Sequence, residues 1–259
     1  MINFHDVNKL GAFTSQKAFL GKLIRLPLWL VPRSAVVPIL QGPGRGLKWI
    51  VGSYNHGCWL GSYEFEKQVI IPQIVQPGDV VCDIGAHVGY FTIIFARLVG
   101  PTGAVYAFEP DSHNHSLIER HVALNGLKNV TAVKAGVGDR DGVAYFEVGA
   151  NSATGKIAPA SATQIELIEL TEFLVRNKLR TPNLIKMDIE GAERVVIPAL
   201  LGFIVKNRIN VLVSTHADSI TRDLVVLLEG NGYTVEPLQW ANQPTVRSKI
   251  NATLLWARL

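Results

Sequence analysis

From Asp79 onward the chain alternates short apolar runs with amphipathic stretches, and this alternation constrains its fold more than any other feature. Several runs, such as VVCDI and INVLV, are almost continuously apolar, which is typical of strands buried on both faces. Alternating strands and helices predict a doubly wound, mostly parallel seven-stranded sheet of the Rossmann-like α/β class. The predicted strands are residues 79–83, 104–108, 130–134, 183–188, 209–215, 232–237 and 251–257. The predicted helices are residues 89–99, 112–124, 171–179, 191–203 and 218–229, and a further helix, 64–75, precedes the alternation. An extra strand is predicted at 143–148.

The region before this alternation differs in charge and in pattern. Residues 1–60 are predicted to form a basic, helical and irregular extension with an aromatic lead-in, and residues 61–259 to form the main domain. The extension has seven Lys and Arg residues and one acid, whereas the rest of the chain has 18 bases and 20 acids. The basic charge therefore belongs to the extension. A nucleic-acid-binding domain would carry a basic face of its own, so we expect no nucleic-acid partner.

Residues 18–40 are the most membrane-like stretch, but three basic residues and three prolines interrupt them. A spanning helix needs ~20 mostly uncharged apolar residues, so we exclude one. Two interpretations stay open: an amphipathic piece that lies on a membrane surface, or a helix that packs on the main domain. The first fifteen residues lack an apolar signal, and the two cysteines form no C-x-x-C pair. We expect a cytoplasmic protein, either free or bound to the cytoplasmic face of a membrane.

The loop after the first strand reads D-I-G-A-H-V-G, with Asp83 and Gly85 at its start and Gly89 at its end. It departs from the dinucleotide fingerprint G-x-G-x-x-G because Ala86 and His87 follow where a second glycine is needed. A carboxylate before the turn repels a pyrophosphate and suits a cation. The loop therefore favours S-adenosylmethionine, which has a sulfonium and an ammonium, over NAD. If His87 is protonated, cofactor affinity should fall below neutral pH.

The next two strands end in residues suited to a nucleoside. Glu109 follows the second strand about 20 residues past the glycine loop, where an acid accepts hydrogen bonds from both ribose hydroxyls. Pro110 then ends the strand. After the third strand, Gly136 and Val137 leave room for an adenine, whose edge their backbone groups would read. Asp139 is either an acceptor for the adenine amino group or part of a plain Asp-Gly turn.

Three elements, DIGAHVG, VYAFEP and KMDIEGAE, resemble in this order and spacing the FkbM family of S-adenosylmethionine-dependent methyltransferases. The resemblance covers residues 45–240. It implies the class I methyltransferase fold and methylation of a hydroxyl on a sugar, a polysaccharide or a secondary metabolite. It assigns the cofactor to Asp83, Gly85, Gly89 and Glu109, and the active-site side to Asp188, Glu190 and Glu193.

The chain departs from the family pattern at two positions. The family usually has Asn where this chain has His87. It often has an acid two residues before the fifth-strand histidine, where this chain has Ser214 before His216. The first departure affects a cofactor contact, and the second an acceptor or metal contact.

Methylation of an alcohol needs a proton acceptor beside the reacting oxygen. Asp188, Glu190 and His216 are the candidates, because all three follow predicted strand ends. A divalent cation held by these same residues is a further option, and oxygen ligands would favour Mg²⁺ over zinc; we assign no metal ligand. For the acids, the alternative is stabilisation of the following helix start, with Lys186 pairing with one of them.

The aromatic loop 49–64 suits a sugar or another small-molecule or glycan acceptor, or else covers the core. Tyr63 and Glu64, at its end, are expected to reach the methionine end of the cofactor. Two rival functions are weighed against the methyltransferase: an NAD-dependent enzyme, and a methyltransferase fold retained for binding at a membrane surface without catalysis. The sequence encodes neither the acceptor nor the oligomeric state.

Overall fold

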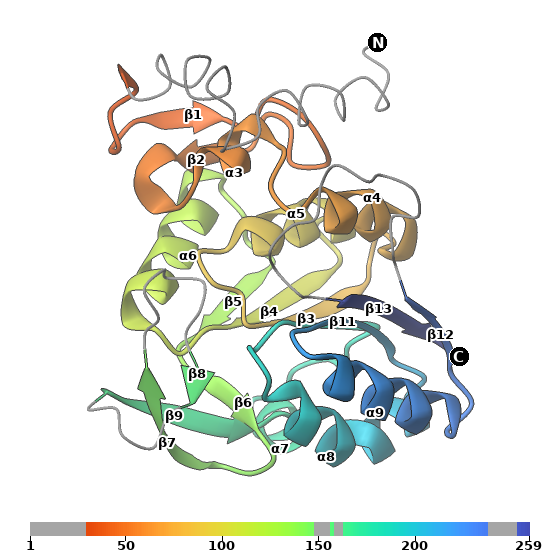
Figure 1. Ribbon diagram of the computed structural model, residues 1–259. Coiled ribbons are helices and arrows are strands. Elements are labelled where there is room, and N and C mark those ends of the chain that lie inside the picture. The colour runs from red at the N-terminus through yellow and green to blue at the C-terminus, as the bar shows by residue number, and fades with distance from the viewer. Residues whose placement is uncertain (1–29, 148–155, 158–162, 238–252) are drawn as a thin grey trace.

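Seven strands form the central sheet of the computed structural model, which describes residues 30–147, 156–157, 163–237 and 253–259 (Figure 1). Their order is β12-β13-β11-β10-β3-β4-β5. All neighbours are parallel except β13, which runs antiparallel to both β11 and β12. This confirms the predicted mostly parallel sheet. The strands are β3 (Val80–Ile84), β4 (Ala104–Phe108), β5 (Val130–Val133), β10 (Leu184–Met187), β11 (Asn210–Thr215), β12 (Thr234–Pro237) and β13 (Thr253–Arg258).

Helices cover both faces of this sheet (Figure 1). One face carries α4 (Phe65–Ile74), α5 (Tyr90–Val99) and α6 (Ser112–Leu124), and the other carries α7 (Leu170–Arg176), α8 (Glu193–Lys206) and α9 (Asp218–Glu229). The sheet has one hydrophobic core on each face. Alternate residues of a strand pack into one core or the other, because successive side chains point to opposite faces. In β3, Cys82 packs on the α8 side and Val81 on the α5 side. Asp83, two residues after Val81, therefore also faces α5.

A second, four-stranded sheet lies beside the carboxyl end of β5, in the order β6-β9-β7-β8. The sequence predicted one of its strands, at 143–148. The others were missed: residues 136–138, which the sequence suggested as an adenine loop, form a short strand, and TQIELIE follows a run of small residues that hides its alternation. The strands are β6 (Gly136–Gly138), β7 (Gly142–Glu147), β8 (Lys156–Ile157) and β9 (Thr163–Glu169).

The described part of the N-terminal region packs onto α5 and α6. It contains the antiparallel pair β1 (Val36–Pro38) and β2 (Lys48–Ile50), a 3-10 turn at Val51–Ser53, and α3 (His56–Leu60). Residues 36–38 are thus a strand rather than part of a helix. Residues 1–29, with half of the membrane-like stretch, lie outside the described residues, so its membrane contact stays a prediction. Within the described ranges no helix has the length and apolar character needed to span a membrane.

Trp49 and His121 join this N-terminal region to the rest of the domain. The fully buried indole of Trp49 stacks on the His121 ring of α6, with ring centroids 3.9 Å apart. The His121 ring also contacts the Val88 carbonyl oxygen at 2.9 Å and the Ser53 hydroxyl at 3.1 Å. Burial lowers the pKa of His121 to about 4, so the ring is neutral near pH 7. The lead-in therefore shares one core with α5 and holds the loop between β3 and α5.

Candidate active site

The site lies where β3, β4, β10 and β11 end. In the parallel register Ile84 pairs with both Phe108 and Met187, and Met187 pairs with Val213. The strands therefore stop at nearly the same level, and the residues after them line one edge of the sheet. Ligands of open α/β sheets bind at this edge.

The glycine loop after β3 is held by backbone contacts. The N–H groups of Gly85 and Ala86 both donate to the carbonyl of Phe108, each at 3.0 Å. Gly85 has a φ of +73°, and a Cβ there would collide with the carbonyl oxygen of Asp188. Gly89, with a φ of +84°, precedes the first turn of α5. The loop therefore touches the start of the β10–α8 connection through backbone atoms.

Asp83, at the end of β3, is linked to this loop through Lys186. Its side chain is 0% exposed, and its carboxylate accepts a hydrogen bond from Thr92 Oγ1 at 2.7 Å and pairs with Lys186 Nζ at 3.0 Å. Lys186 also donates to the Gly85 carbonyl at 2.9 Å. Lys186 thus pairs with Asp83, and not with Glu190 or Glu193 as the sequence suggested. Because the Asp83 side chain is fully buried, it can influence a bound cofactor through its charge and through the loop, and a direct contact stays a prediction.

Glu109 follows β4 and holds the loop from the other side. Its carboxylate accepts from the backbone N–H of His87 at 2.8 Å and from that of Asp111 at 3.0 Å. The residue is 5% exposed. Burial raises its pKa to about 7, although the two backbone hydrogen bonds oppose that rise. The carboxylate still has acceptor capacity, since each of its oxygens has two lone pairs. This donor-seeking group suits the two hydroxyls of a ribose.

His87 sits inside the loop with a φ of +52°. Its ring lies edge-on to that of Tyr54, with centroids 4.6 Å apart. Burial, together with the charge of Lys186, lowers its pKa to about 4. The ring is therefore neutral above pH 5, and the expected loss of cofactor affinity just below neutral pH does not arise from His87. Whether its side chain contacts the cofactor stays a prediction.

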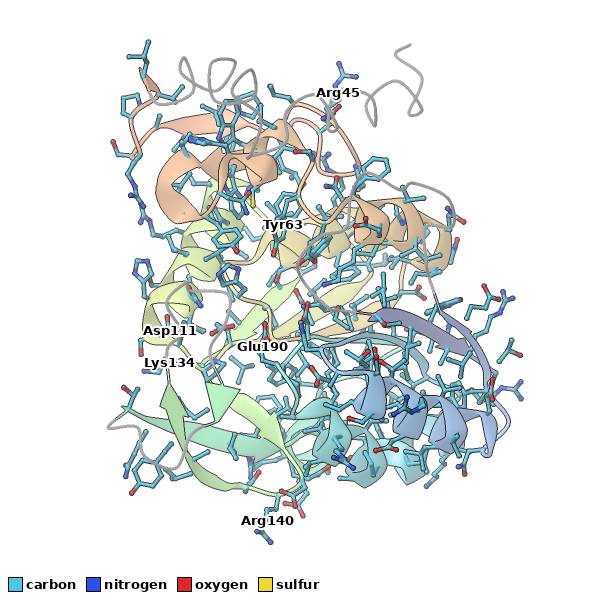
Figure 2. The ribbon with its side chains drawn as sticks, viewed as in Figure 1. Arg45, Tyr63, Asp111, Lys134, Arg140 and Glu190 are labelled. Carbon is cyan, nitrogen blue, oxygen red and sulfur yellow. The ribbon has the colours of Figure 1, made fainter. Side chains whose placement is uncertain are left out.

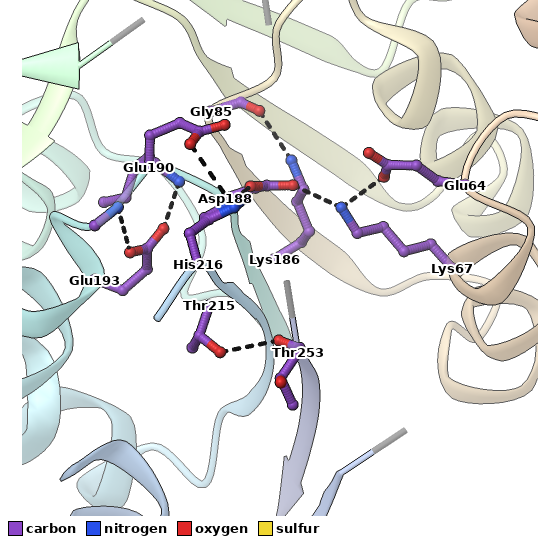
Figure 3. A network of polar contacts seen from close by, with 12 residues as sticks. Glu64, Lys67, Gly85, Lys186, Asp188, Glu190, Glu193, Thr215, His216 and Thr253 are labelled. Atoms are coloured by element: carbon purple, nitrogen blue, oxygen red, sulfur yellow. Dashed lines mark hydrogen bonds and ion pairs between the residues drawn. The ribbon is translucent and has the colours of Figure 1, made fainter. Parts of the chain in front are cut away.

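Asp188 is the centre of the polar network at the end of β10 (Figure 3). Its Oδ2 lies 2.6 Å from Lys67 Nζ, and its Oδ1 lies 2.9 Å from His216 Nε2. Lys67 Nζ also lies 2.6 Å from Glu64 Oε2, which brings α4 into the site. The other ring nitrogen of His216, Nδ1, lies 3.7 Å from Glu190 Oε2. The three predicted active-site residues, Asp188, Glu190 and His216, are thus brought together.

These contacts set the protonation states. Burial alone would raise the pKa of Asp188, but the charge of Lys67 and the hydrogen bond from His216 hold it well below its usual range. The same hydrogen bond raises the pKa of His216 above its ordinary value. Burial raises the pKa of Glu190. Asp188 is therefore a poor proton acceptor, and His216 and Glu190 are better ones.

In the EGAE element, residues 190–193, the side chain of Glu193 binds backbone groups of the loop just before it. Glu193, in the first turn of α8, is fully buried and accepts from the backbone N–H groups of Ile189 at 2.7 Å and Gly191 at 2.8 Å. These bonds hold Glu190 at a φ of +54° in the loop before the helix. Glu193 thus shapes the loop that presents Glu190, and Glu190 itself is outside the helix.

A cation site is one arrangement to test here, because Asp188, Glu193 and His216 each offer a ligand atom within 4.8 Å of the others. The donor set does not fit this use. Both oxygens of Asp188 are engaged by Lys67 and His216, and both oxygens of Glu193 by backbone N–H groups. An ammonium already supplies the positive charge at Asp188. We therefore derive no chemistry from a metal at these residues.

The remaining predicted residues flank this edge. Pro110 is partly exposed after Glu109. Val137 has its side chain buried in the core, so a role of Gly136 and Val137 in cofactor binding rests on their backbone. Tyr63, labelled in Figure 2, packs edge-on against Tyr90 at the start of α5, with ring centroids 5.5 Å apart.

Two residues of the site carried no sequence prediction of their own. Lys67 lies in α4, which the sequence predicts as a helix at 64–75 without assigning the lysine a role, although a lysine among Val, Ile and Pro residues is a signal of burial with a partner. Tyr54 was noted only as one of several aromatic residues. Its pKa is raised by burial and by charges that include Glu64 and Glu190, which places its hydroxyl in the field of the site.

The fold and the site together define the class. A seven-stranded sheet in this order, with a glycine loop after β3 and an acid after its neighbour β4, is the class I methyltransferase fold. The family model of the methyltransferase FkbM domain matches residues 83–235. The chain therefore belongs to the FkbM methyltransferase family and is an enzyme of the methyltransferase class. The two rival functions, an NAD-dependent enzyme and a non-catalytic binding protein, have no support in this family.

Curated relatives and a solved structure agree with this assignment. Hexuronic acid methyltransferase AglP of Haloferax volcanii is 24% identical over 216 residues, which cover 80% of this chain and 87% of the relative. The 31-O-demethyl-FK506 methyltransferase FkbM of Streptomyces tacrolimicus is 26% identical over 197 residues, which cover 62% and 75%. A methyltransferase FkbM structure from Methylobacillus flagellatus KT matches with a TM-score of 0.50 and 15% identity, covering 78% of this chain and 55% of that one.

The contact between Gly85 and Asp188 predicts a large effect of Gly85→Ala. The substitution adds a strained positive-φ residue, which costs about 1–3 kcal/mol, and a backbone clash on top of it. We expect the free energy of unfolding, measured by urea denaturation, to fall by about 3 kcal/mol or more. Gly126→Ala is the matched control, because Gly126 has a φ of +62° with no atom within 4 Å of a Cβ. It should lose about 1 kcal/mol. Equal losses in the two variants would refute the close contact.

Proposed function

We propose that this enzyme transfers a methyl group from S-adenosylmethionine to a hydroxyl of a sugar, a polysaccharide or a secondary metabolite. One observation carries the proposal: the backbone carbonyl of Asp188, whose side chain pairs with His216, lies so close to Gly85 of the glycine loop that no Cβ fits between them. A cofactor on the loop and a proton acceptor for the substrate would therefore share one edge of the sheet. The contacts around this edge support each half of the reaction separately.

On the cofactor side, Glu109 is the proposed ribose acceptor, and the loop from Gly85 to Gly89 is the proposed seat of the methionine part. The residues fit the cofactor, since a buried carboxylate with a raised pKa gains from two hydroxyl donors. Tyr63 and Glu64 are proposed to face the methionine end. The Glu64 carboxylate, 2.6 Å from Lys67 Nζ, is an acidic group on this side, which suits a ligand with an ammonium. S-adenosylmethionine, when bound, supplies an activated methyl group on a sulfonium.

On the acceptor side, His216 is the proposed general base. Asp188 is ionised and can only accept, so Nε2 of His216 carries the hydrogen and Nδ1 holds the lone pair. The substrate hydroxyl oxygen would attack the methyl carbon while its proton passes to Nδ1 and the carbon–sulfur bond breaks. Glu190, 3.7 Å from Nδ1, stabilises the imidazolium that forms. Asp188 fixes the ring and its tautomer.

The acceptor class rests on the relatives and on the aromatic loop. One relative is named for a hexuronic acid and another for 31-O-demethyl-FK506. In this chain the Tyr54 ring lies edge-on to the His87 ring. Burial, and also the charge of Glu190, raises the pKa of the Tyr54 hydroxyl. Trp59 donates a hydrogen bond to His56 Nδ1 at 3.0 Å on the helix that follows. Aromatic faces with a few polar groups suit a carbohydrate or a similar hydroxylated molecule.

The assignment of Glu109 predicts how cofactor binding depends on pH. The carboxylate is protonated below its pKa of about 7 and then loses its charge-assisted hydrogen bonds. Affinity for S-adenosylmethionine, measured by calorimetry, should rise about tenfold from pH 6 to pH 8. Glu109→Ala should weaken binding by about 1–3 kcal/mol and remove this pH dependence. Glu119→Ala, an exposed acid on the same side of the fold, is the control and should change neither.

The outcome that contradicts the cofactor assignment is equally direct. Binding of NAD without binding of S-adenosylmethionine would remove the proposed reaction. Unchanged affinity in Glu109→Ala would remove the ribose assignment alone.

The assignment of His216 predicts a pH profile for the chemical step. The base must be neutral, and the hydrogen bond to Asp188 raises its pKa above the ordinary value, so kcat at saturating cofactor should rise with pH and reach half its maximum above pH 6.5. His216→Asn should lower kcat about 10²–10⁴-fold. His113→Asn, an exposed histidine on α6, should leave the profile unchanged. A profile in wild type that is flat from pH 6 to pH 9 would contradict the role of His216.

A further inference from the structure

Lys67 is a buried cation that the proposed reaction has not yet used. It lies in the first turns of α4, before the region that the family model matches, and its side chain is 8% exposed. Its ammonium lies 5.5 Å from the centroid of the Phe91 ring of α5. Burying an ammonium costs several kcal/mol unless partners compensate. The position therefore demands strong partners, and both of them lie at the active site.

The two partners are carboxylates from different parts of the chain. Lys67 Nζ lies 2.6 Å from Glu64 Oε2 on the segment leading into α4, and 2.6 Å from Asp188 Oδ2 at the end of β10 (Figure 3). Burial by itself would lower the pKa of Lys67, but Asp188 and Glu64 raise it above its ordinary value. Lys67 is therefore a permanent positive charge that bridges the cofactor side to the acceptor side.

We propose that Lys67 is a positioning residue for methyl transfer: by holding one oxygen of Asp188, it turns the other oxygen toward His216 and fixes the imidazole with Nδ1 directed to the acceptor. This inference rests on the proposed function of His216 as the base. Lys67 and His216 divide one carboxylate between them, Oδ2 for the ammonium and Oδ1 for the ring. Losing either partner would let the carboxylate rotate and would change the charge that the ring experiences.

The charges that face His216 determine the sign of the effect. Asp188 at the end of β10, Glu190 in the loop before α8 and Glu193 in its first turn all raise the pKa of His216. Lys67 on α4 stands across the same carboxylate, and Lys186 adds a second positive charge that acts on Asp188. A positive charge at Lys67 opposes a second positive charge on the ring. Removing it should therefore favour the imidazolium.

A purely structural role for Lys67 makes a different prediction. If the ammonium only anchored α4, its loss would lower stability and leave the titration of His216 unchanged. The titration of the ring is thus the readout that separates the two roles. It is measured on the cofactor-free full chain and needs no knowledge of the acceptor.

The experiment follows the His216 ring by NMR with labelled histidine, and identifies its signal among the seven histidines by its loss in His216→Asn. In Lys67→Met the pKa of His216 should rise by about one unit. Lys67→Gln, which keeps a hydrogen-bond donor without the charge, should shift it in the same direction and serves if the Met variant does not fold. Lys67→Arg, which retains the charge, should keep the wild-type value. Asp188→Asn should shift the pKa downward, below the wild-type value.

The outcomes separate this inference from the proposed function. An unchanged His216 pKa in folded Lys67→Met or Lys67→Gln would overturn the positioning role, even if methyl transfer is intact. Shifts in the expected directions, matched by equal shifts in the pH profile of kcat, would support both. Shifts in the ring pKa that the kcat profile does not follow would support the electrostatic link to Lys67 and remove His216 as the base.

Discussion

The carboxylate of Asp188 is the interaction on which the rest of the site depends. It follows β10, the central strand of the seven. Its carbonyl oxygen occupies the space that a side chain at Gly85 would need, and its two carboxylate oxygens join Lys67 to His216. The glycine loop, α4 and the end of β11 are thus held relative to one another through one residue. A buried carboxylate needs partners on both oxygens, and these partners are what bring the three segments together.

The sheet explains why such a residue can exist. The parallel strands β3, β4, β10 and β11 end at nearly one level, so side chains from the four segments that follow them lie along one edge of the sheet. One hydrophobic core packs on each face of the sheet behind this edge. Charges are distributed across this edge in pairs: Asp83 with Lys186 beneath the loop, and Asp188 with Lys67 beside it. Glu109 differs from both acids, because the partners that the structure describes for it are neutral donors: the backbone N–H groups of His87 and Asp111, and Asn114 Nδ2 at 3.5 Å. That difference is why its pKa is raised while that of Asp188 is lowered, and why it suits a ligand that brings hydroxyl donors.

Local patterns in the sequence were sufficient for most of the fold. Apolar runs of four to six residues identify strands buried on both faces, and the seven central strands are observed within a few residues of their predicted bounds. The acids and glycines of the site were predictable because their positions depend only on where strands end. Lys67 was not, since its main partner lies 121 residues away and its helix has no distinguishing pattern. The side sheet was missed because short strands among small residues carry little periodic signal.

The most direct test of the account is a structure of this protein with S-adenosylhomocysteine bound. The account predicts ribose hydroxyls within hydrogen-bonding distance of the Glu109 carboxylate, and a sulfur atom that faces the Asp188–His216 pair across Gly85. The methyl group of the donor would then point toward Nδ1 of His216. A nucleoside bound away from Glu109, or a sulfur atom directed away from His216, would contradict it.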